Sequence, residues 1–473
     1  MIALALVLLP LLTALALSLG KVRRHATEVL IAAGLLCTAL AVFEVSSPTS
    51  DFLFLRLVRL DAPGRLFLVL VNGIFLGISA YVGGRVRSTP ELVDEGARFS
   101  MLALAFLAAT NVVLMANHLL VQWIALEATA LAVAPLIVRP GVPASRQASW
   151  RYFLFSSVGL ALVVLGIVCL GRGMEAAGHT PNFFLDQLPP VTGSWGKLGL
   201  ALVILGLGTK LGLAPMYSWL PEAYDEAPPA VTALLGAVQF NCALVMLMRV
   251  LQAWRADNAT LVTTELLVMG VVSMVVSTAS IIATRNMKRL LAYASINHAG
   301  VIAIGLGIGK GATYGVLLYV ISNAFIKAIL FLTAGKIKAH YRTKDTRKIQ
   351  GLIKDLPYSG AFLMVGTFAL LGFPPFGSFF GELLILSALV GSGQILVFAA
   401  FCVLITMTFV ATGRTIFPMI WGEPKQAVTW PRQRLGTVAP KLVFLIALVA
   451  LGVFVPPAVN ELLQDVVHSL EGR

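Results

Sequence analysis

Apolar stretches of about 20 residues follow one another along almost the whole chain, and each is long enough as a helix to cross a hydrocarbon core of about 30 Å. Hydrophobic residues make up 58% of the 473 residues, and charged residues only 12%. Soluble domains carry about 25% charged residues, so this chain lacks the charge to cover a soluble surface. The sequence therefore predicts an all-α polytopic membrane protein.

The spacing of the apolar stretches predicts about fourteen transmembrane helices. They lie at residues 2–19, 28–46, 66–85, 99–115, 117–137, 152–171, 197–217, 228–252, 261–283, 289–309, 312–336, 358–391, 395–420 and 440–463. The first helix has no basic residue before it, and Lys-Val-Arg-Arg (21–24) follows it. A cleaved signal peptide has the opposite polarity, so we expect this helix to be retained. The largest connections, near 173–195 and 339–357, are too short for a separate domain.

Lysine and arginine gather in the connections after predicted helices 1, 5, 9 and 11. They are Lys21, Arg23 and Arg24; Arg139, Arg146 and Arg151; Arg285, Lys288 and Arg289; and the stretch from Lys336 to Lys354. By the positive-inside rule these connections face the cytoplasm, and both termini then lie outside it. Basic loops held at an anionic leaflet account for the net charge of +13, so the lipid bilayer, and no nucleic acid, is the expected partner.

The cysteine and histidine pattern predicts no metal site. The four cysteines stand singly within predicted helices, without a C-x-x-C pair, a histidine cluster or a haem-type spacing. They are Cys37, Cys169, Cys242 and Cys402. No dinucleotide-binding or P-loop glycine pattern is present either. We expect no cofactor on this chain, so any redox cofactor would belong to another subunit.

Five ionisable side chains stand near the middle of predicted helices, where each costs about 2.5–3.5 kcal/mol on insertion scales. They are Glu127, Lys210, His298, Lys327 and Glu382. Unpaired and facing lipid, they would together cost on the order of 10 kcal/mol, so we expect them to face protein, water or one another. Burial favours the uncharged forms of lysine and glutamate, which lets such groups exchange protons near neutral pH. The pattern predicts a proton relay.

Each of the five residues also has a structural interpretation. These are a static ion pair for Glu127 and Lys210, an interhelical hydrogen bond for His298, a snorkelling side chain for Lys327, and a tie across a broken helix for Glu382. Snorkelling is disfavoured because Ile329 to Ala334 continue apolar beyond the lysine. A neighbouring segment is expected to form a solvated turn; it carries Tyr217, Trp219, Glu222, Asp225 and Glu226.

Prolines interrupt two of the predicted helices beside these charges. Pro215 follows Lys210, and Pro374 and Pro375 precede Glu382. Broken helices at membrane depth are tolerated where their backbone is buried in protein or lines a cavity, and matching breaks in two halves point to inverted repeats. We therefore predict that helices 7 and 12 are broken and belong to two inverted five-helix repeats, formed by helices 4–8 and 9–13. The resulting segments are 1–98 (three helices), 99–252, 261–420, and 440–473 (one helix and a short tail).

The stretch around Lys210 resembles the signature of the antiporter-like proton-translocating subunits of complex I, membrane-bound hydrogenases and multisubunit cation/proton antiporters. It reads Lys-Leu-Gly-Leu-Ala-Pro (210–215), Trp-Leu-Pro-Glu-Ala-Tyr (219–224) and Glu-Ala-Pro-Pro (226–229). Segments 288–296, 325–335 and 373–382 resemble the later motifs of the family in their usual order. Asn-Cys-Ala (241–243) with Arg249 is most similar to the hydrogenase-4 component F branch.

This resemblance implies a role for each charged position. Glu127 would pair with Lys210 and gate the relay, Lys327 would be a lysine of the central axis, His298 matches a histidine of some members, and Glu382 would be the terminal group. The breaks at Pro215, Pro374 and Pro375 would take part in gating. Redox chemistry in a partner arm carrying iron–sulfur clusters would drive the protons. Further antiporter-like subunits would be neighbours in a prokaryotic inner membrane.

Two positions depart from the family pattern. Asn241 stands where many relatives have a lysine, and Asn323 where many have a histidine. Asparagine binds water but carries no proton at neutral pH. Either water bridges Lys210 to Lys327, or protons enter elsewhere, or pumping is impaired. Two other functions stay open: a subunit of a cation/proton antiporter or ion-gradient-driven uptake complex without a redox partner, and a scaffold that only docks neighbours.

Overall fold

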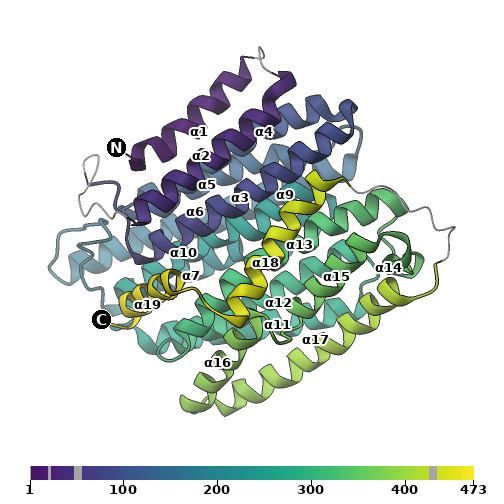
Figure 1. The fold of residues 1–473 in the computed structure, drawn as a ribbon. Coiled ribbons are helices and arrows are strands. Elements are labelled where there is room, and N and C mark those ends of the chain that lie inside the picture. Colours follow the sequence, from purple (N-terminus) through teal and green to yellow (C-terminus); the bar gives the residue numbers. More distant parts are fainter. Residues whose placement is uncertain (1, 20–22, 47–55, 425–433, 473) are drawn as a thin grey trace.

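The computed structural model describes residues 2–19, 23–46, 56–424 and 434–472. Lys21, one of the predicted loop cations, lies outside the described residues. The described chain is a bundle of roughly parallel and antiparallel helices (Figure 1). Its N-terminal part comprises α1 (Ile2–Ser18), α2 (Ala26–Ser46) and α3 (Ala62–Ser88), with short 3₁₀ turns η1 (Arg23–His25) and η2 (Pro90–Leu92).

Two further groups of helices follow, and two helices close the chain. The first group is α4 (Val93–Met115), α5 (Leu119–Ile137), α6 (Pro143–Ala176), α7 (Gly193–Leu211), α8 (Trp219–Glu226), α9 (Pro229–Leu234), the π-helical turn η3 (Leu235–Gln239) and α10 (Phe240–Trp254). The second group is α11 (Ala259–Ala283), α12 (Met287–Ile308), α13 (Thr313–Tyr341), η4 (Thr346–Lys348), α14 (Leu352–Asp355), α15 (Pro357–Leu370), α16 (Gly377–Gly391) and α17 (Ile395–Trp421). The last two are α18 (Leu435–Val453) and α19 (Pro457–Glu471).

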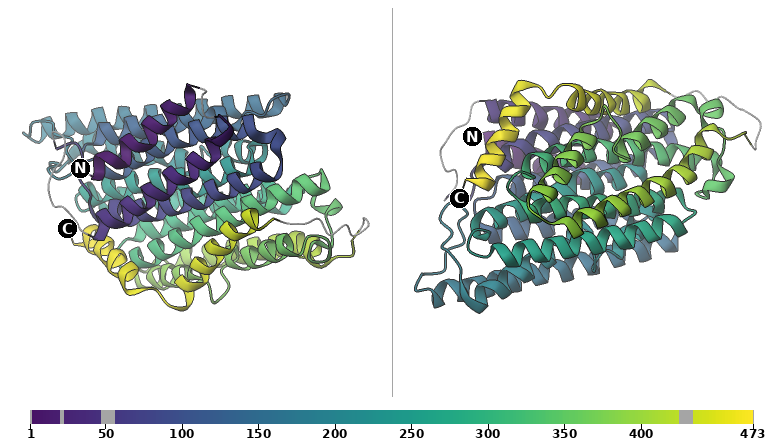
Figure 2. Two further views of the ribbon diagram at one scale, coloured as in Figure 1. Left: turned by 45° about the horizontal axis from the view of Figure 1, so that its top comes forward. Right: turned by 90° about the horizontal axis from the view of Figure 1, so that it is seen from below.

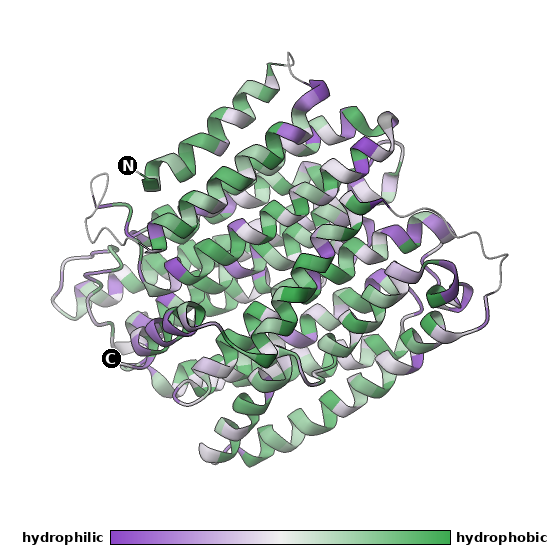
Figure 3. Ribbon diagram, in the orientation of Figure 1, coloured by the Kyte–Doolittle hydropathy of each residue, from purple (hydrophilic) through white to green (hydrophobic). Residues whose placement is uncertain are grey.

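The prediction of an all-α membrane protein is confirmed. In the described part of the chain, eleven helices are long and apolar enough to cross a membrane, and α1, α15 and α16 are shorter apolar helices. Apolar residues cover the flanks of the bundle, and many polar residues lie toward its two ends (Figure 3). The segment from α9 to α10 and most of α13 are buried inside the bundle, whereas α17 lies mainly at its surface. The inner helices therefore surround any charge that they carry with protein.

The bundle has two distinguishable ends. The start of α1 and the whole of α19 lie at one of them, here named the α19 end (Figures 1 and 2). The short helix α8 lies at the other, the α8 end, beside the starts of α12 and α15 and the last turn of α13. Helices α6 and α7 pack closely against each other. A Cβ atom on Gly206 of α7 would lie 2.5 Å from the carbonyl oxygen of Gly159 on α6, so these two helices approach as only small residues allow.

Both predicted helix breaks are present, and one predicted helix differs. The seventh helix stops at Leu211, and the twelfth is divided into α15 and α16. The single helix predicted over 440–463 is instead two helices, because Pro456 and Pro457 follow the end of α18. Proline lacks the N–H that a continuing helix needs and suits the first turn of a new one. The new helix, α19, is amphipathic and turns only Leu463 and Val466 fully inward.

Candidate functional site: a row of buried ionisable side chains

Lys210 and Glu127 are held by two consecutive serines of α6. Lys210, in the last turn of α7, is only 4% exposed, and its Nζ donates to Ser156 Oγ. Ser157 Oγ donates to Glu127 Oε1 over 2.7 Å. The lysine and the glutamate interact electrostatically, but the ion pairs found among the described residues include none between them. The expected direct pair is therefore replaced by an arrangement in which each charge has its own hydroxyl partner.

The break after Lys210 is stabilised by side chains from two other elements. Gly212 adopts a left-handed conformation with φ +76°, which ends α7. Trp219 Nε1 donates to the Thr209 carbonyl over 2.9 Å, and Ser273 Oγ accepts from the Ala214 N–H over 2.8 Å. Pro215 itself lies exposed. Two backbone groups at the break, the Thr209 carbonyl and the Ala214 N–H, thus have side-chain partners.

Lys327 is the next charged residue of the row. It lies on α13 with 2% exposure, and its Nζ has no hydrogen-bond partner among the described residues. The nitrogen lies 4.0 Å from the centre of the Phe240 ring, a cation–π contact. The snorkelling interpretation is wrong for this lysine because the side chain ends inside the bundle.

His298 and Asn323 form an interhelical hydrogen bond. Nδ1 of His298 on α12 lies 3.0 Å from Oδ1 of Asn323 on α13, and the imidazole packs 5.4 Å from the Tyr319 ring. The imidazole also has a hydrogen-bond partner in the backbone of Leu370, and either ring nitrogen can carry the hydrogen of the neutral form. Asn323 and Leu370 together hold the histidine in place.

Glu382 folds back over the second helix break. A Cβ atom on Gly372 would lie 2.3 Å from Glu382 Oε2, and Gly372 has φ +66°. Only glycine accommodates both the conformation and the carboxylate. Oε1 of Glu382 is buried without a hydrogen-bond partner, while Pro374 and Pro375 lie exposed in the break. The carboxylate thus has one oxygen free to take a proton or a water.

Asn241 lies directly after the π-helical turn. Its Nδ2 donates to the Ala237 carbonyl over 2.7 Å, and its Oδ1 is buried without a partner. Within the same turn, Gln239 accepts from the Tyr152 hydroxyl over 2.9 Å and donates to Thr129 over 3.0 Å. π-Turns often mark functional sites. Here the turn places a polar bridge between α5 and α6, and a buried unpartnered oxygen follows it at Asn241.

The five predicted residues fall into two groups that both contact α10, and the row denotes the two groups together. Lys210 interacts with Glu127 on one side and with Cys242 of α10 on the other. Lys327 lies over Phe240, two residues before that cysteine, and interacts with His298. The row continues through Tyr319, which contacts His298 and interacts with Glu382. Four further residues link the charges and were not predicted from the sequence: Ser156, Ser157, Gln239 and Tyr319. Their only signal in the sequence is that they are polar residues within apolar helices.

The segment from Trp219 to Glu226 is not the solvated turn that the sequence analysis expected. Trp219 and Asp225 are buried. Asp225 pairs with Lys344 at 2.6 Å and Arg289 at 3.2 Å, and Glu226 with Lys344 at 2.9 Å. Three more basic side chains bind this helix: Arg139 pairs with Glu226, Arg151 with Glu222, and Lys288 donates to the carbonyls of Asp225 and Ala227. Several lysines and arginines therefore hold α8 in place. The sequence signal for this arrangement is that three acidic residues lie in one short segment while the other connections are rich in basic residues.

This cluster should make stability depend on acid pH. Burial acts to raise the pKa values of Asp225 and Glu226, but hydrogen bonds and charge from Lys344 outweigh it and hold both pKa values below their usual range. A lowered carboxyl pKa contributes stability above the unfolded-state value, near 4, which is lost as pH falls through the folded-state value. We expect the melting temperature of the detergent-solubilised complex to fall as the pH drops below about 5, and to fall less in Asp225→Asn. An equal fall in Asp225→Asn and in the exposed control Asp257→Asn would contradict this.

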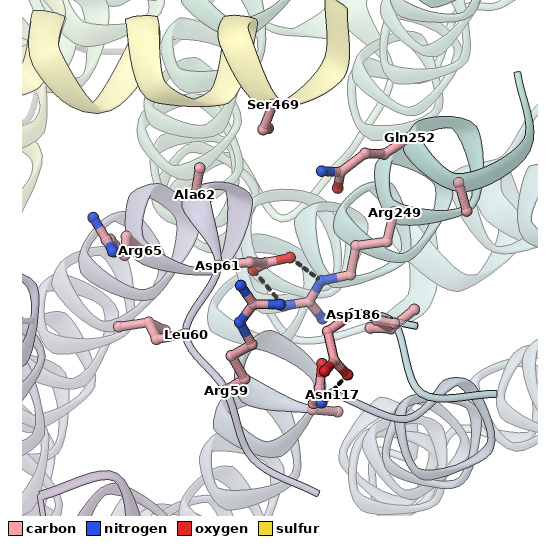
Figure 4. A pocket seen from close by; sticks show the side chains of 13 residues that line it. Arg59, Leu60, Asp61, Ala62, Arg65, Asn117, Asp186, Arg249, Gln252 and Ser469 are labelled. Carbon is pink, nitrogen blue, oxygen red and sulfur yellow. Dashed lines mark hydrogen bonds and ion pairs between the residues drawn. The ribbon is translucent and has the colours of Figure 1, made fainter. Parts of the chain in front are cut away.

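A second ionic site lies at the α19 end. Arg249 of α10, the residue singled out with the Asn-Cys-Ala motif, is 2% exposed in its side chain and binds Asp61 with two hydrogen bonds of 2.7 and 2.8 Å. It also donates to the carbonyls of Val113 and Leu114. Asp61 caps the N-terminus of α3. The pair forms one wall of a polar cavity of about 230 Å³, toward which Ser469 of α19 points (Figure 4).

No group of three or more histidine, cysteine or carboxylate side chains lies close enough to hold a metal ion in the described ranges. The cysteines described there are all free. The chemistry available at the row is therefore proton binding and release by amine, imidazole, phenol and carboxyl groups.

The sequence is similar to known membrane subunits. Residues 116–408 match the family model described as NADH:quinone oxidoreductase/Mrp antiporter, transmembrane. The chain is 30% identical to a hydrogenase-4 component F homologue of Methylacidiphilum infernorum, over 86% of this chain and 89% of the relative. It is 27% identical to the NADH-quinone oxidoreductase subunit N of Herminiimonas arsenicoxydans, over 80% and 79%.

Solved structures share the fold. A chain of the archaeal membrane-bound sulfane sulfur reductase superimposes with a TM-score of 0.85 at 21% identity, covering 99% of this chain and 97% of that one. A chain of the Mrp complex of Dietzia sp. DQ12-45-1b gives 0.84 at 20% identity, covering 99% and 96%. With the family model, the relatives and the row of buried charges in agreement, the chain belongs to the NADH:quinone oxidoreductase/Mrp antiporter family of membrane subunits.

Proposed function

We propose that this chain is a proton-translocating subunit of a membrane-bound redox complex of the hydrogenase-4 or complex I type. The observation that carries the proposal is Lys327, an amine buried without a hydrogen-bond partner and flanked in the row by Lys210 and His298. An unpaired buried charge is costly, whereas an amine that is alternately neutral and protonated is tolerated and functional. A static scaffold has no need for such a group. The relative named as a hydrogenase-4 component F homologue favours the redox assignment.

In the proposed path, protons pass from Lys210 to Lys327 through water, then by His298 and Tyr319 to Glu382. The unpartnered Oδ1 of Asn241 supports the first step, because it is a buried acceptor to which a water could donate. His298 would take the next proton on its unprotonated ring nitrogen while the hydrogen bond to Asn323 holds the ring. The gate would be Glu127, whose movement away from Ser157 toward Lys210 would favour the protonated amine. Pro215, Pro374 and Pro375 would keep the breaks open to such movement.

The arrangement of the helices supports proposals on the internal repeats and on the orientation in the membrane. We propose that α4–α10 and α11–α17, which correspond to the predicted segments 99–252 and 261–420, are inverted five-helix repeats, since each contains one broken helix beside a charged group of the row. They would lie between segments 1–98 and 440–473 and complete fourteen crossings. The α8 end, rich in arginine and lysine, would face the cytoplasm, with both termini outside a prokaryotic inner membrane. The chain itself would carry no cofactor; neighbouring membrane subunits and an arm with iron–sulfur clusters would complete the complex.

The choice between a redox pump and a cation antiporter can be tested in inverted vesicles that contain the native complex. We expect H₂ or NADH, added as electron donor, to drive proton uptake in sodium-free buffer, because the row is built of proton-exchanging groups. Uptake is measured with a pH-sensitive dye, and a protonophore serves as the control. Uptake that requires Na⁺ and proceeds without an electron donor would contradict the redox assignment and favour the antiporter.

A further inference from the structure

A groove lies at the α8 end, between α11, α17 and the loop that follows α13. It has a volume of about 810 Å³. Its lining residues are Ile282, Ala283, Thr284, Arg285, Thr346, Arg347, Gln350, Thr406, Met407, Val410, Ala411, Arg414, Thr415 and Pro418. None of these side chains belongs to the row of buried charges or to the ion pairs around α8. The groove therefore needs an explanation of its own.

The lining of the groove divides into a basic part and an apolar part. Three arginines line it, and no aspartate or glutamate does. Arg285 and Arg414 are exposed, and neither makes an ion pair among the described residues; the third, Arg347, is bound by Asp345. Ile282, Val410 and Met407 expose 57%, 58% and 45% of their surfaces. A basic end joined to an exposed apolar wall matches an amphiphile with an anionic head.

Hydrogen bonds between its elements hold the groove in a defined shape. Thr278 of α11 and Thr408 of α17 share a buried hydrogen bond of 2.8 Å, which joins the two helices that line the groove. The loop after α13 is attached to the end of α11 because Thr346 N and Oγ1 both donate to the Arg285 carbonyl, over 2.9 and 3.2 Å. Arg285, just after α11, and Arg414 of α17 thus line one groove from two different elements.

We propose that this groove binds an anionic phospholipid, with its phosphate between Arg285 and Arg414 and an acyl chain along Ile282, Met407 and Val410. Basic pockets between transmembrane helices bind anionic headgroups, and arginine suits a phosphate because its planar donors bind two oxygens at once. A soluble phosphate would leave the apolar wall exposed, and a zwitterionic lipid would leave the two arginines without a net counter-charge. The site is independent of the proposed proton path.

A photoreactive phosphatidylglycerol tests the proposal with the full complex reconstituted in phosphatidylcholine vesicles. We expect cross-links to peptides containing Met407 and Val410. The double variant Arg285→Gln/Arg414→Gln should reduce their yield about 30-fold at subsaturating lipid, since each basic residue contributes about 1 kcal/mol near an anionic lipid. Arg285→Lys/Arg414→Lys keeps the charge and should retain most of the yield. The control Arg146→Gln removes an exposed arginine of α6 from the same end and should change nothing.

Three results would overturn the proposal. One is an equal yield from photoreactive phosphatidylcholine, which would mean that the groove takes lipid without regard to charge. Another is an unchanged yield in the double variant with glutamine. The third is the absence of cross-links in the assembled complex together with loss of a neighbouring subunit from the glutamine variant, which would assign the groove to a protein partner. Melting temperatures of all variants exclude misfolding as the cause of a lost cross-link.

Discussion

Lys327→Met is expected to reduce proton translocation by roughly 10²-fold, the lower end of what a positioned proton-transfer group contributes, while the complex still assembles. Methionine keeps the length and flexibility of the lysine stem but has no proton to exchange. Because the amine has no hydrogen-bond partner, its loss strands no acceptor. Removing an uncompensated polar group from the bundle should leave the melting temperature unchanged or raise it, by the equivalent of about 1–3 kcal/mol.

The separation between transport and stability makes this prediction informative. Lys310→Met is a suitable control because Lys310 is exposed in the connection before α13, and it should alter neither property. Proton uptake and thermal denaturation are measured on the same preparations. A Lys327→Met complex that is destabilised but pumps normally would identify Lys327 as a structural residue and contradict its place in the relay.

Asp61→Ala is expected to lower the stability of the complex by about 3–5 kcal/mol, the effect of leaving one member of a buried ion pair alone. Arg249 is almost completely buried and gives two of its hydrogen bonds to Asp61. The carbonyls of Val113 and Leu114 remain as acceptors in the variant, so we expect the lower part of that range. Thermal denaturation in detergent measures the change.

A rescue and a control distinguish this effect from general damage to the α19 end. Arg249→Met in the Asp61→Ala background removes the stranded charge and should restore most of the stability. Asp465→Ala removes a partner of Arg65 at 3.8 Å whose side chain is half exposed, and exposed pairs contribute about 0–1 kcal/mol. Equal losses in Asp61→Ala and Asp465→Ala, or no rescue, would show that the buried pair does not hold α3 to α10.

The charges of the row could be predicted from sequence because each interrupts an apolar stretch. Lys210 and Lys327 stand out in this way, and prolines next to two of the five groups marked the helix breaks. The hydroxyl and amide side chains that link the charges could not be predicted. Ser156 and Ser157 resemble any serines in a membrane helix, where such residues commonly bond their own backbone. Only the packing of α5, α6 and α7 shows that they receive Glu127 and Lys210.

Contacts between distant segments account for the other differences. Asp225 pairs with Lys344, which lies in a loop more than a hundred residues later, so local sequence showed an acidic turn and a basic loop but not their pairing. The positive-inside rule counts such cations for topology and does not reveal which of them pair with acids. The division between α18 and α19 was available in Pro456 and Pro457, but an apolar window that spans both prolines conceals it.

The most direct test of the central claim is the number of protons taken up per electron-donor turnover by the native complex in inverted vesicles, compared between wild type and Lys327→Met. If the row carries protons through this chain, the ratio falls in the variant at matched turnover and matched assembly, while Lys310→Met keeps the wild-type ratio. An unchanged ratio in Lys327→Met would mean that protons bypass the buried row, and the proposed function of this chain as a proton-conducting subunit would be wrong.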